Sequence, residues 1–237
     1  MKLASLFTGG KDSVYATHLI LQAGEEVAYL VSMHPRRPDS WMFHTVNLHL
    51  VPLSAQALGI PLVEQETSGE KENELDDLKS ILSMLSIEGV VSGAIASSYQ
   101  RTRIERICRE LGVVAVTPLW RRDPVELLRE MIDSGLVITV TAVAALGLDE
   151  FWLGRRIDHR ACDALVELSR KYGINVCGDG GEMETLVLDA PFFKKRLHVL
   201  TTTKHWEGDG GSLYVEATLV EKGPSSSASQ DLNVEAW

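Results

Sequence analysis

The chain has 237 residues, of which 45% are hydrophobic and 24% are charged, a composition typical of globular proteins. This composition excludes a fibrous or wholly disordered protein, and the length allows one large domain or two small ones. The formal net charge is −10, with 12 basic and 14 acidic residues in 1–122 and 11 basic and 19 acidic residues in 123–237. This acidic balance disfavours binding along RNA or DNA.

The first half of the chain alternates short apolar runs with helical patterns. Leu3-Ala4-Ser5-Leu6 predicts a strand, and a helix follows that Gly24 ends. The further elements expected here are a strand at 27–33, a loop at 34–40, a helical stretch at 42–58 interrupted near Pro52 and a strand at 61–63. Residues 64–74 are expected to form a polar loop and the first turn of a helix that continues over 75–85; a strand at 89–95, a helix at 98–111 and a strand at 113–116 follow. This alternation predicts a doubly wound, mostly parallel α/β sheet, whose ligands bind beyond the carboxyl ends of the strands.

The pattern changes around residues 118–123, and Pro124 is well placed as the first residue of a helix that runs to Ser134. We therefore expect a domain boundary between 122 and 123, with a smaller α+β domain over 123–222. Its expected elements are a strand at 136–143, a helix at 158–171, a loop of glycines and acidic residues at 178–184, and strands at 185–188, 196–203 and 213–219. The composition of residues 223–237 predicts a flexible tail.

Cys108, Cys162 and Cys177 are too far apart for a zinc knuckle or a redox pair, so we expect three buried thiols in a reducing compartment. Residues 9–12 interrupt the apolar core that a signal peptide would need. The longest uncharged run, 134–148, is too short to span a bilayer. We therefore expect a cytoplasmic protein without a membrane partner.

The run Thr8-Gly9-Gly10-Lys11-Asp12-Ser13 lies where the first strand turns into the first helix. Paired glycines can direct backbone N–H groups toward one point, and the start of a helix adds the positive end of its dipole, so this turn favours an anion. It is not a Walker A loop, which needs Gly where Ser5 stands and Ser or Thr where Asp12 stands. The alternative interpretation is a glycine turn that only joins the two elements.

These residues resemble the pyrophosphate loop of N-type ATP pyrophosphatases, Ser-Gly-Gly-x-Asp-Ser, with Thr8 in place of the first serine. Residues 39–44, 88–103, 118–120 and 180–192 are similar to the diphthine–ammonia ligase family. The resemblance extends over about residues 1–222 and implies an adenine nucleotide alpha hydrolase-like (HUP-like) fold. It departs from the family pattern at Asp179, where the family usually has Glu, and at Met183, where it usually has an aromatic residue.

The resemblance implies the last step of diphthamide synthesis, in which diphthine, a modified histidine of translation elongation factor 2, is amidated with ATP and ammonium. A carboxylate is a poor acyl donor, so the family's reaction passes through an acyl-adenylate and releases AMP and pyrophosphate. Charge builds on the departing pyrophosphate, and donors aimed there lower the barrier. The acidic balance indicates no stable binding of nucleic acid. No glutaminase segment is recognisable, so ammonia would come from solution or from a partner, and the oligomeric state stays open, a homodimer included.

We assign the turn after the first strand to the phosphates of ATP, with Lys11 and Asp12 as catalytic residues. The expected donors to the β- and γ-phosphates are Thr8, Gly9, Gly10, Lys11 and Ser13. A carboxylate beside phosphates repels them unless a cation intervenes, so Asp12 is expected to hold Mg²⁺ directly or through water. Its alternative role is to cap the helix.

The segment after residues 89–95 is expected to bind the nucleoside. Gly93 would allow a close approach to the ribose or adenine, and hydrogen-bonding groups would come from Ser97, Ser98, Tyr99 and Gln100. The alternative for Ser97 or Ser98 is a helix cap. Two further residues are candidates for nucleotide contacts, Arg103 for a phosphate and His44 as a contact or proton shuttle; their alternative is an ordinary helix surface.

Glu182 and Glu184 are the remaining catalytic candidates. As alternating residues of an extended segment they would point to the same side. Two carboxylates there would suit ammonium or the quaternary ammonium group of diphthine, especially with aromatic faces nearby. The alternative is a glycine-rich turn with solvated charges.

Two other functions remain as alternatives. One is an ATP-dependent ligase that modifies an RNA base, which the acidic balance and the absence of paired catalytic cysteines disfavour. The other is a nucleotide-binding protein without catalysis, which would bind ATP and release no pyrophosphate.

Overall fold

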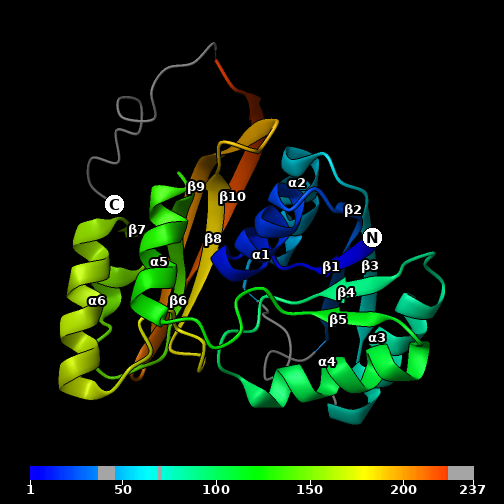
Figure 1. Ribbon diagram of the computed structural model, residues 1–237. Coiled ribbons are helices and arrows are strands. Elements are labelled where there is room, and N and C mark those ends of the chain that lie inside the picture. The colour runs from blue at the N-terminus through cyan, green and yellow to red at the C-terminus, as the bar shows by residue number, and fades with distance from the viewer. Residues whose placement is uncertain (37–45, 69–70, 224–237) are drawn as a thin grey trace.

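The computed structural model describes residues 1–36, 46–68 and 71–223. Its first half is a parallel sheet of five strands in the order β3-β2-β1-β4-β5 (Figure 1). The strands are β1 (Lys2–Leu6), β2 (Glu26–Pro35), β3 (Leu62–Thr67), β4 (Gly89–Val91) and β5 (Val114–Val116). The predicted doubly wound α/β sheet is confirmed.

Helices cover both faces of this sheet. On one side lie α1 (Lys11–Gln22) and α2 (Val51–Leu58), and on the other α3 (Lys71–Ser83) and α4 (Ser98–Leu111) (Figure 1); a 3-10 turn, η1 (Leu48–Leu50), precedes α2. From β1 the chain adds β2 and then β3 on one side of β1 in the sheet, and it then crosses to the other side of β1 to form β4 and β5. The strands β1 and β4 are therefore neighbours at the point where the strand order reverses. Ligands of doubly wound sheets bind beyond the carboxyl ends of strands at such a point.

The second half is an α+β unit, as predicted, and its sheet is antiparallel. The strand β6 pairs with β7, β8 and β10, and β9 pairs with β10. Its elements are α5 (Pro124–Asp133), β6 (Val137–Val143), η2 (Glu150–Trp152), β7 (Arg156–Ile157), α6 (His159–Tyr172), β8 (Met183–Asp189), β9 (Lys195–Glu207) and β10 (Gly210–Glu221). No helix among the residues that the structure describes is long and apolar enough to cross a membrane.

One hydrophobic core joins the two halves. Phe7 from the end of β1, Leu119 from the connection between the halves, Ile138 from β6 and Leu186 from β8 belong to the same buried cluster. A second cluster lies under α3 and α4 on the opposite face of the parallel sheet. Burial of each such side chain stabilises the fold by roughly 1.5–3 kcal/mol. The two sheets are therefore held together by apolar packing as well as by the connecting chain.

Asn47 connects the halves by hydrogen bonds. Its side chain is buried, its Nδ2 donates to the carbonyl oxygen of Leu213 at 2.8 Å, and its Oδ1 accepts from the amide of Val215 at 2.8 Å.

Because Asn47→Ala leaves two backbone groups of β10 unpaired, we expect a loss of about 2–4 kcal/mol in the free energy of unfolding, measured in urea. The exposed Gln56→Ala on α2 is the control, with an expected change under about 0.5 kcal/mol; equal losses in both variants would contradict the prediction.

Some element boundaries differ from the predictions. The strand β2 runs on to Pro35 and β3 on to Thr67, into two stretches predicted as loops, because the strands pair with each other over residues 30–35 and 62–67. Pro52 lies in the first turn of α2 and begins this helix instead of interrupting it. β4 ends at Val91, four residues before the predicted end. The segment 39–44 and the predicted tail from 224 onward lie outside the described residues.

Candidate active site

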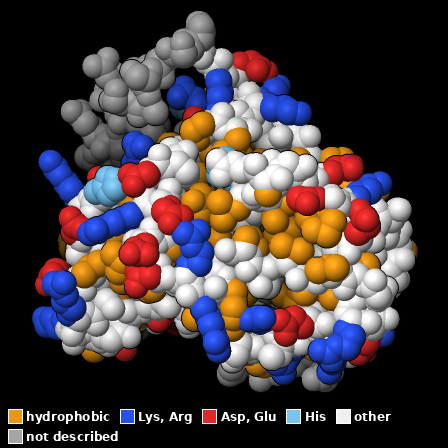
Figure 2. Space-filling view, viewed as in Figure 1, with side chains coloured by type: hydrophobic (Ala, Val, Ile, Leu, Met, Phe, Trp, Pro, Cys, Tyr) orange, Lys and Arg blue, Asp and Glu red, His pale blue; other side chains and the backbone are white. Residues whose placement is uncertain are grey.

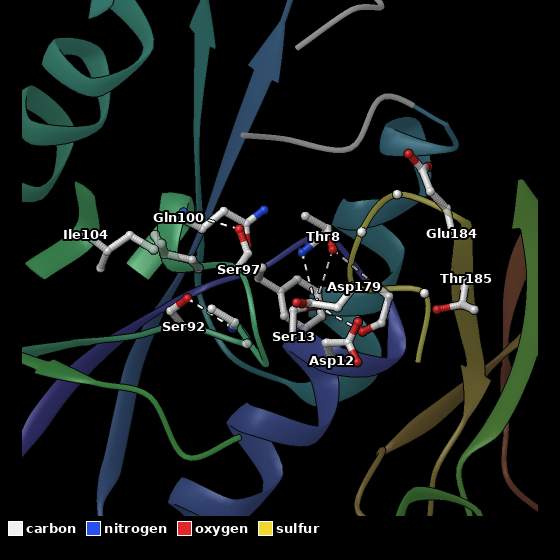
Figure 3. Close-up of a pocket in the computed structure, with 18 of the residues that line it drawn as sticks. Thr8, Asp12, Ser13, Ser92, Ser97, Gln100, Ile104, Asp179, Glu184 and Thr185 are labelled. Atoms are coloured by element: carbon white, nitrogen blue, oxygen red, sulfur yellow. Dashed lines mark hydrogen bonds between the residues drawn. The ribbon is translucent and has the colours of Figure 1, made fainter. Parts of the chain in front are cut away.

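A cavity of about 610 Å³ opens at the carboxyl ends of β1 and β4 and is closed by the loop before β8. Its volume is within the usual range for small-molecule sites, roughly 300–1,000 Å³. Figure 3 shows Thr8, Ser13 and Asp12 near its middle, Ser97 and Gln100 on one side, and Glu184 and Thr185 on the other. The expected site residues that line it are Thr8, Gly10, Asp12, Ser13, Gly93, Ser97, Tyr99, Gln100 and Glu184.

The turn after β1 is closed by its own hydroxyl groups. The amide of Thr8 donates to Ser13 Oγ at 3.2 Å, and Ser13 Oγ donates to the carbonyl oxygen of Gly10 at 3.0 Å. Gly9 has a φ of +76°, a conformation that glycine adopts without strain. The helix α1 begins at Lys11, and its N-cap residue Gly10 makes no side-chain cap. Gly10, Asp12 and Ser13 line the cavity, so the amino end of α1 faces it, and helix amides and the dipole favour an anion there.

Lys11 and Asp12 form a buried ion pair beneath this turn. The Lys11 side chain is almost fully buried, and its Nζ donates to Asp12 Oδ1 at 3.0 Å, to Asp12 Oδ2 at 2.8 Å and to the carbonyl oxygen of Cys177. Burial alone would lower the pKa of Lys11, but the interactions with Asp12, Cys177 and Asp179 together outweigh it, and the pKa is raised. Lys11 does not line the cavity. The expectation that it donates to phosphates does not fit this geometry, because the loop before β8 covers its ammonium group.

The carboxylate of Asp12 itself reaches the cavity and is bonded to Lys11 rather than to the amides of α1. Its alternative role as a helix cap is therefore not what the structure shows. Among the described residues no cluster of three or more His, Cys, Asp or Glu could hold a metal ion. Mg²⁺ commonly uses one or two carboxylates together with phosphates and water, so a single carboxylate beside an anion-binding turn fits Mg²⁺ bound with a nucleotide.

Gly93 brings the turn after β4 against the first turn of α1. A Cβ atom added at Gly93 would lie 2.8 Å from the carbonyl carbon of Asp12 and 3.0 Å from the amide nitrogen of Ser13. We expected Gly93 to allow a close approach to the ribose or adenine of a nucleotide. In the structure, the atoms closest to the position of its missing side chain are backbone atoms of Asp12 and Ser13. Because Gly93 also lines the cavity, its lack of a side chain keeps the two turns together at the site.

The start of α4 supplies some of the expected nucleoside contacts but not all. Ser97 is the N-cap residue of α4, where its Oγ accepts from the amide of Gln100 at 3.3 Å, so the capping alternative is confirmed for a residue that also lines the cavity. Ser98 and Arg103 do not line it. The guanidinium carbon of Arg103 lies 3.4 Å from the ring centroid of Tyr99, a cation–π contact that turns it onto its own helix. His44 lies outside the described residues.

The sequence reasoning missed Asp179 as a site residue. Its Oδ2 accepts from the amide of Ala96 at 2.8 Å and its Oδ1 from the amide of Ile95 at 3.3 Å. The same side chain lines the cavity, so it joins the loop before β8 to the turn after β4. The sequence signal was an acidic residue between Gly178 and Gly180, which we noted only as a departure from the family pattern.

Glu182 and Glu184 do not point to the same side. The strand β8 begins at Met183, so Glu182 belongs to the preceding loop. There its carboxylate accepts from the amides of Asn175 at 3.0 Å and Gly180 at 2.8 Å. Glu182 lines a separate hollow of about 280 Å³, which shares Ser97, Asp179 and Gly180 with the main cavity. Glu184 lines the main cavity and extends away from Asp12 (Figure 3).

The three cysteines are buried free thiols, as expected. Burial raises the pKa of Cys177 to about 12 and that of Cys108 to about 11. Thiolate nucleophiles need a depressed pKa, so these two residues do not support cysteine-based transfer of sulfur to a nucleic acid. Figure 2 shows basic and acidic side chains interspersed over the face that it presents, which is unlike the basic tract of a nucleic-acid-binding surface.

Comparison with known proteins matches two family models, the diphthamide synthase N-terminal domain over residues 1–115 and the diphthamide synthase C-terminal domain over residues 123–220. The diphthine–ammonia ligase of Homo sapiens is 38% identical over 222 residues, which cover 84% of this chain and 83% of that protein. The diphthine–ammonia ligase of Schizosaccharomyces pombe is 36% identical, covering 94% of this chain and 40% of a longer protein. A solved structure described as a predicted subunit of tRNA methyltransferase from Methanocaldococcus jannaschii aligns with a TM-score of 0.46 at 15% identity, over 81% of this chain and 98% of that one. Two matching family models and relatives of this similarity show that the chain belongs to the diphthine–ammonia ligase family.

Proposed function

We propose that this chain is an ATP-dependent ligase that converts the carboxylate of diphthine on translation elongation factor 2 to the amide, using ammonium. The reaction would pass through an acyl-adenylate and release AMP and pyrophosphate. The observation that carries the proposal is one cavity that unites the turn after β1, the turn after β4 and Glu184 of β8, in a chain of the diphthine–ammonia ligase family.

In this proposal residues 1–122 bind ATP. The β- and γ-phosphates would lie at the amino end of α1, against the amides and hydroxyls of Thr8, Gly10 and Ser13. The nucleoside would lie toward Tyr99 and Gln100, where apolar side chains of β1 and β2 also line the cavity. Mg²⁺ held by Asp12 would offset the negative charge of the phosphates.

Lys11 takes a different role from the one expected from the sequence. We assign it to positioning: its ammonium group holds the carboxylate of Asp12 and the carbonyl oxygen of Cys177 at once. It thereby couples the phosphate-binding turn to the loop that closes the cavity. The backbone supports the same coupling, because the amide of Val187 in β8 donates to the carbonyl oxygen of Gly9 at 2.9 Å.

Residues 123–222 would bind the acceptor. Two carboxylates of this half line the main cavity, Asp179 and Glu184. Asp179 is bonded to the amides of Ile95 and Ala96, whereas Glu184 lies at the side opposite Ser97 and Gln100 (Figure 3). A negative charge there would attract ammonium and the quaternary ammonium group of diphthine, and would accept a proton from ammonium before attack on the acyl-adenylate.

Replacement of Glu184 by Gln keeps the shape and removes this charge. We expect kcat/KM for amidation to fall about 10- to 100-fold, the loss of one charged contact, while the Kd for ATP changes less than about threefold. Initial rates at varied ammonium and acceptor, with ATP binding measured by calorimetry, test this. The control is Glu221→Gln, whose side chain is 77% exposed in a surface pair with Lys195. Unchanged amidation by Glu184→Gln would remove Glu184 from the mechanism.

The proposed reaction as a whole is tested by incubating the protein with ATP, ammonium and diphthine-bearing elongation factor 2. Mass analysis of the modified histidine should show the amide, and AMP and pyrophosphate should form in equal amounts. Formation of ADP would contradict the proposed cleavage between the α- and β-phosphates. Bound, intact ATP without pyrophosphate release would favour a nucleotide-binding protein without catalysis.

A further inference from the structure

Three segments of the second sheet meet at one end. Val143, the last residue of β6, pairs with Met183 at the start of β8 and with Gly211 near the start of β10. The segment 144–153 that follows β6 therefore lies beside the loop before β8 and beside the turn between β9 and β10. This end of the sheet is the one that reaches the cavity.

Large apolar side chains are exposed at this end of the sheet. Phe151 is 77% exposed and Leu146 is 72% exposed, while the nearby Leu148 and Trp152 are buried and anchor the segment. A partner that covered a side chain such as Leu146 or Phe151 would gain roughly 1.5–3 kcal/mol. The segment is therefore held in place by Leu148 and Trp152, while Leu146 and Phe151 are exposed to a partner.

Two partly exposed aromatic rings extend the apolar area on either side. A Cβ added at Gly211 would lie 2.5 Å from Trp206 and 3.1 Å from the side chain of Leu153, so the Trp206 ring lies beside segment 144–153. A Cβ added at Gly147 would lie 2.5 Å from the ring of Tyr172, at the end of α6. We name Leu146, Phe151, Tyr172 and Trp206 together the β6-end surface.

Segment 144–153, which carries Leu146 and Phe151 of the β6-end surface, is hydrogen-bonded to the loop before β8. The amide of Ala144 donates to the carbonyl oxygen of Glu182 at 2.9 Å. Glu182 lines the smaller hollow, which shares three residues with the main cavity. Because Ala144 is only two residues from Leu146, a chain lying on this surface needs to extend only a short way to bring a side chain to the cavity.

The charges around the surface indicate the chemistry of its partner. Asp149 and Glu150 precede Phe151, and Glu207 and Asp209 follow Trp206. Three nearby basic groups have local partners, Arg155 over the ring of Trp152, Lys171 over the ring of Tyr172, and His205 at 3.7 Å from Glu207. A fourth, Lys204, is exposed two residues before Trp206, so the four acidic residues exceed the basic groups without a local partner. An apolar centre with an acidic rim, on a chain of net charge −10, is complementary to a segment that is apolar and basic.

From this arrangement we infer that the β6-end surface docks an apolar, basic segment of the protein acceptor and holds the acceptor while its modified histidine occupies the cavity. The inference rests on the proposed function, because only a macromolecular acceptor reaches beyond the cavity. A small acceptor that carries the same modified side chain would fill the cavity without touching Leu146 or Phe151.

The test compares the full chain with the double variant Leu146→Ser, Phe151→Ser. Both side chains are exposed, so the variant should unfold in urea at the same midpoint. Initial rates are measured against intact diphthine-bearing elongation factor 2 and against a short peptide that carries diphthine. We expect KM for the intact factor to rise about 10-fold or more, the usual effect of removing central apolar contacts, with the peptide rate and KM for ATP unchanged. The control is Met84→Ser, which is 70% exposed and precedes β4, at the opposite end of the parallel strands.

Each outcome decides the inference. An unchanged KM for the intact factor overturns the docking proposal and leaves the proposed function in place. An equal rise in KM for factor and peptide also overturns it, because the variant has then altered the cavity. A change in molecular mass by light scattering, without a change in KM, assigns the surface to a second copy of the chain and overturns it too. Absence of amidation by the unaltered chain with either acceptor overturns the proposed function, and docking of an acceptor with it.

Discussion

Replacement of Asp12 by Asn is expected to lower the rate of amidation by about 100-fold or more and to destabilise the fold. The rate falls because the variant loses the carboxylate assigned to Mg²⁺, so that the phosphate charge is less well compensated. Stability falls because Lys11 is 1% exposed and loses its charged partner. Breaking a buried pair costs roughly 3–5 kcal/mol, and since the Asp12 side chain is 28% exposed we expect about 2–3 kcal/mol. Pyrophosphate release and urea unfolding measure the two effects.

The stability effect should depend on pH in a definite direction. The folded-state pKa of Lys11 is raised above its ordinary value of 10.5, so the stability that the pair provides is fully present below pH 10.5 and is lost as the pH rises through the folded-state pKa. The difference in unfolding free energy between the natural chain and Asp12→Asn should therefore be constant through neutral pH and shrink in the alkaline range. A difference that instead grew with pH would show that Lys11 is not the group involved.

An exposed ion pair provides the matched control for this substitution. Asp163 lies 3.0 Å from Arg129, and its side chain is 67% exposed. Exposed pairs contribute about 0–1 kcal/mol, so Asp163→Asn should change the unfolding free energy by no more than that and leave pyrophosphate release unaltered. If Asp12→Asn were no more destabilising than Asp163→Asn, the buried position of Lys11 would have no energetic consequence.

Much of the fold follows from local sequence signals. The helix predicted at 98–111 has the observed bounds of α4, because its apolar positions recur at helical spacing and Gly112 ends it with a positive φ. By contrast, β3 was predicted too short, because Glu64 and Glu66 read as loop residues. Their backbone groups pair with β2 across the sheet, and such pairing depends on residues far away in the chain.

The candidate site also has parts that could be predicted from the sequence and parts that could not. The turn 8–13 and its place at the end of β1 could be predicted, because glycines, strand and helix are adjacent in the chain. The hydrogen bonds of the Lys11 side chain could not be predicted, since the carbonyl oxygen to which it donates belongs to Cys177, 166 residues away. Asp179 was missed for the same reason, because its partners are backbone amides 83 and 84 residues earlier. Long-range contacts of this kind leave no periodic pattern in a sequence.

Gly93→Ala is expected to have the second-largest effect. The added Cβ would lie 2.8 Å from the carbonyl carbon of Asp12, 2.9 Å from its oxygen and 3.0 Å from the amide nitrogen of Ser13. All three atoms are backbone, so no side chain can rotate to relieve the contact, and the turn after β4 must move away from the amino end of α1. Overpacking of this kind typically costs about 1–3 kcal/mol of stability.

The consequence for function is larger than the loss of stability, because both turns line the cavity. If ATP spans them, its phosphates on α1 and its nucleoside near α4, separating the turns should raise the Kd for ATP at least about 10-fold, since ångström-scale misplacement disrupts several contacts at once. Titration calorimetry measures this directly. The control is Gly223→Ala, where an added Cβ would meet no atom within 4 Å. An ATP affinity in Gly93→Ala within twofold of the natural chain would mean that the nucleotide does not bridge the two turns, and the proposed orientation of ATP would have to be abandoned.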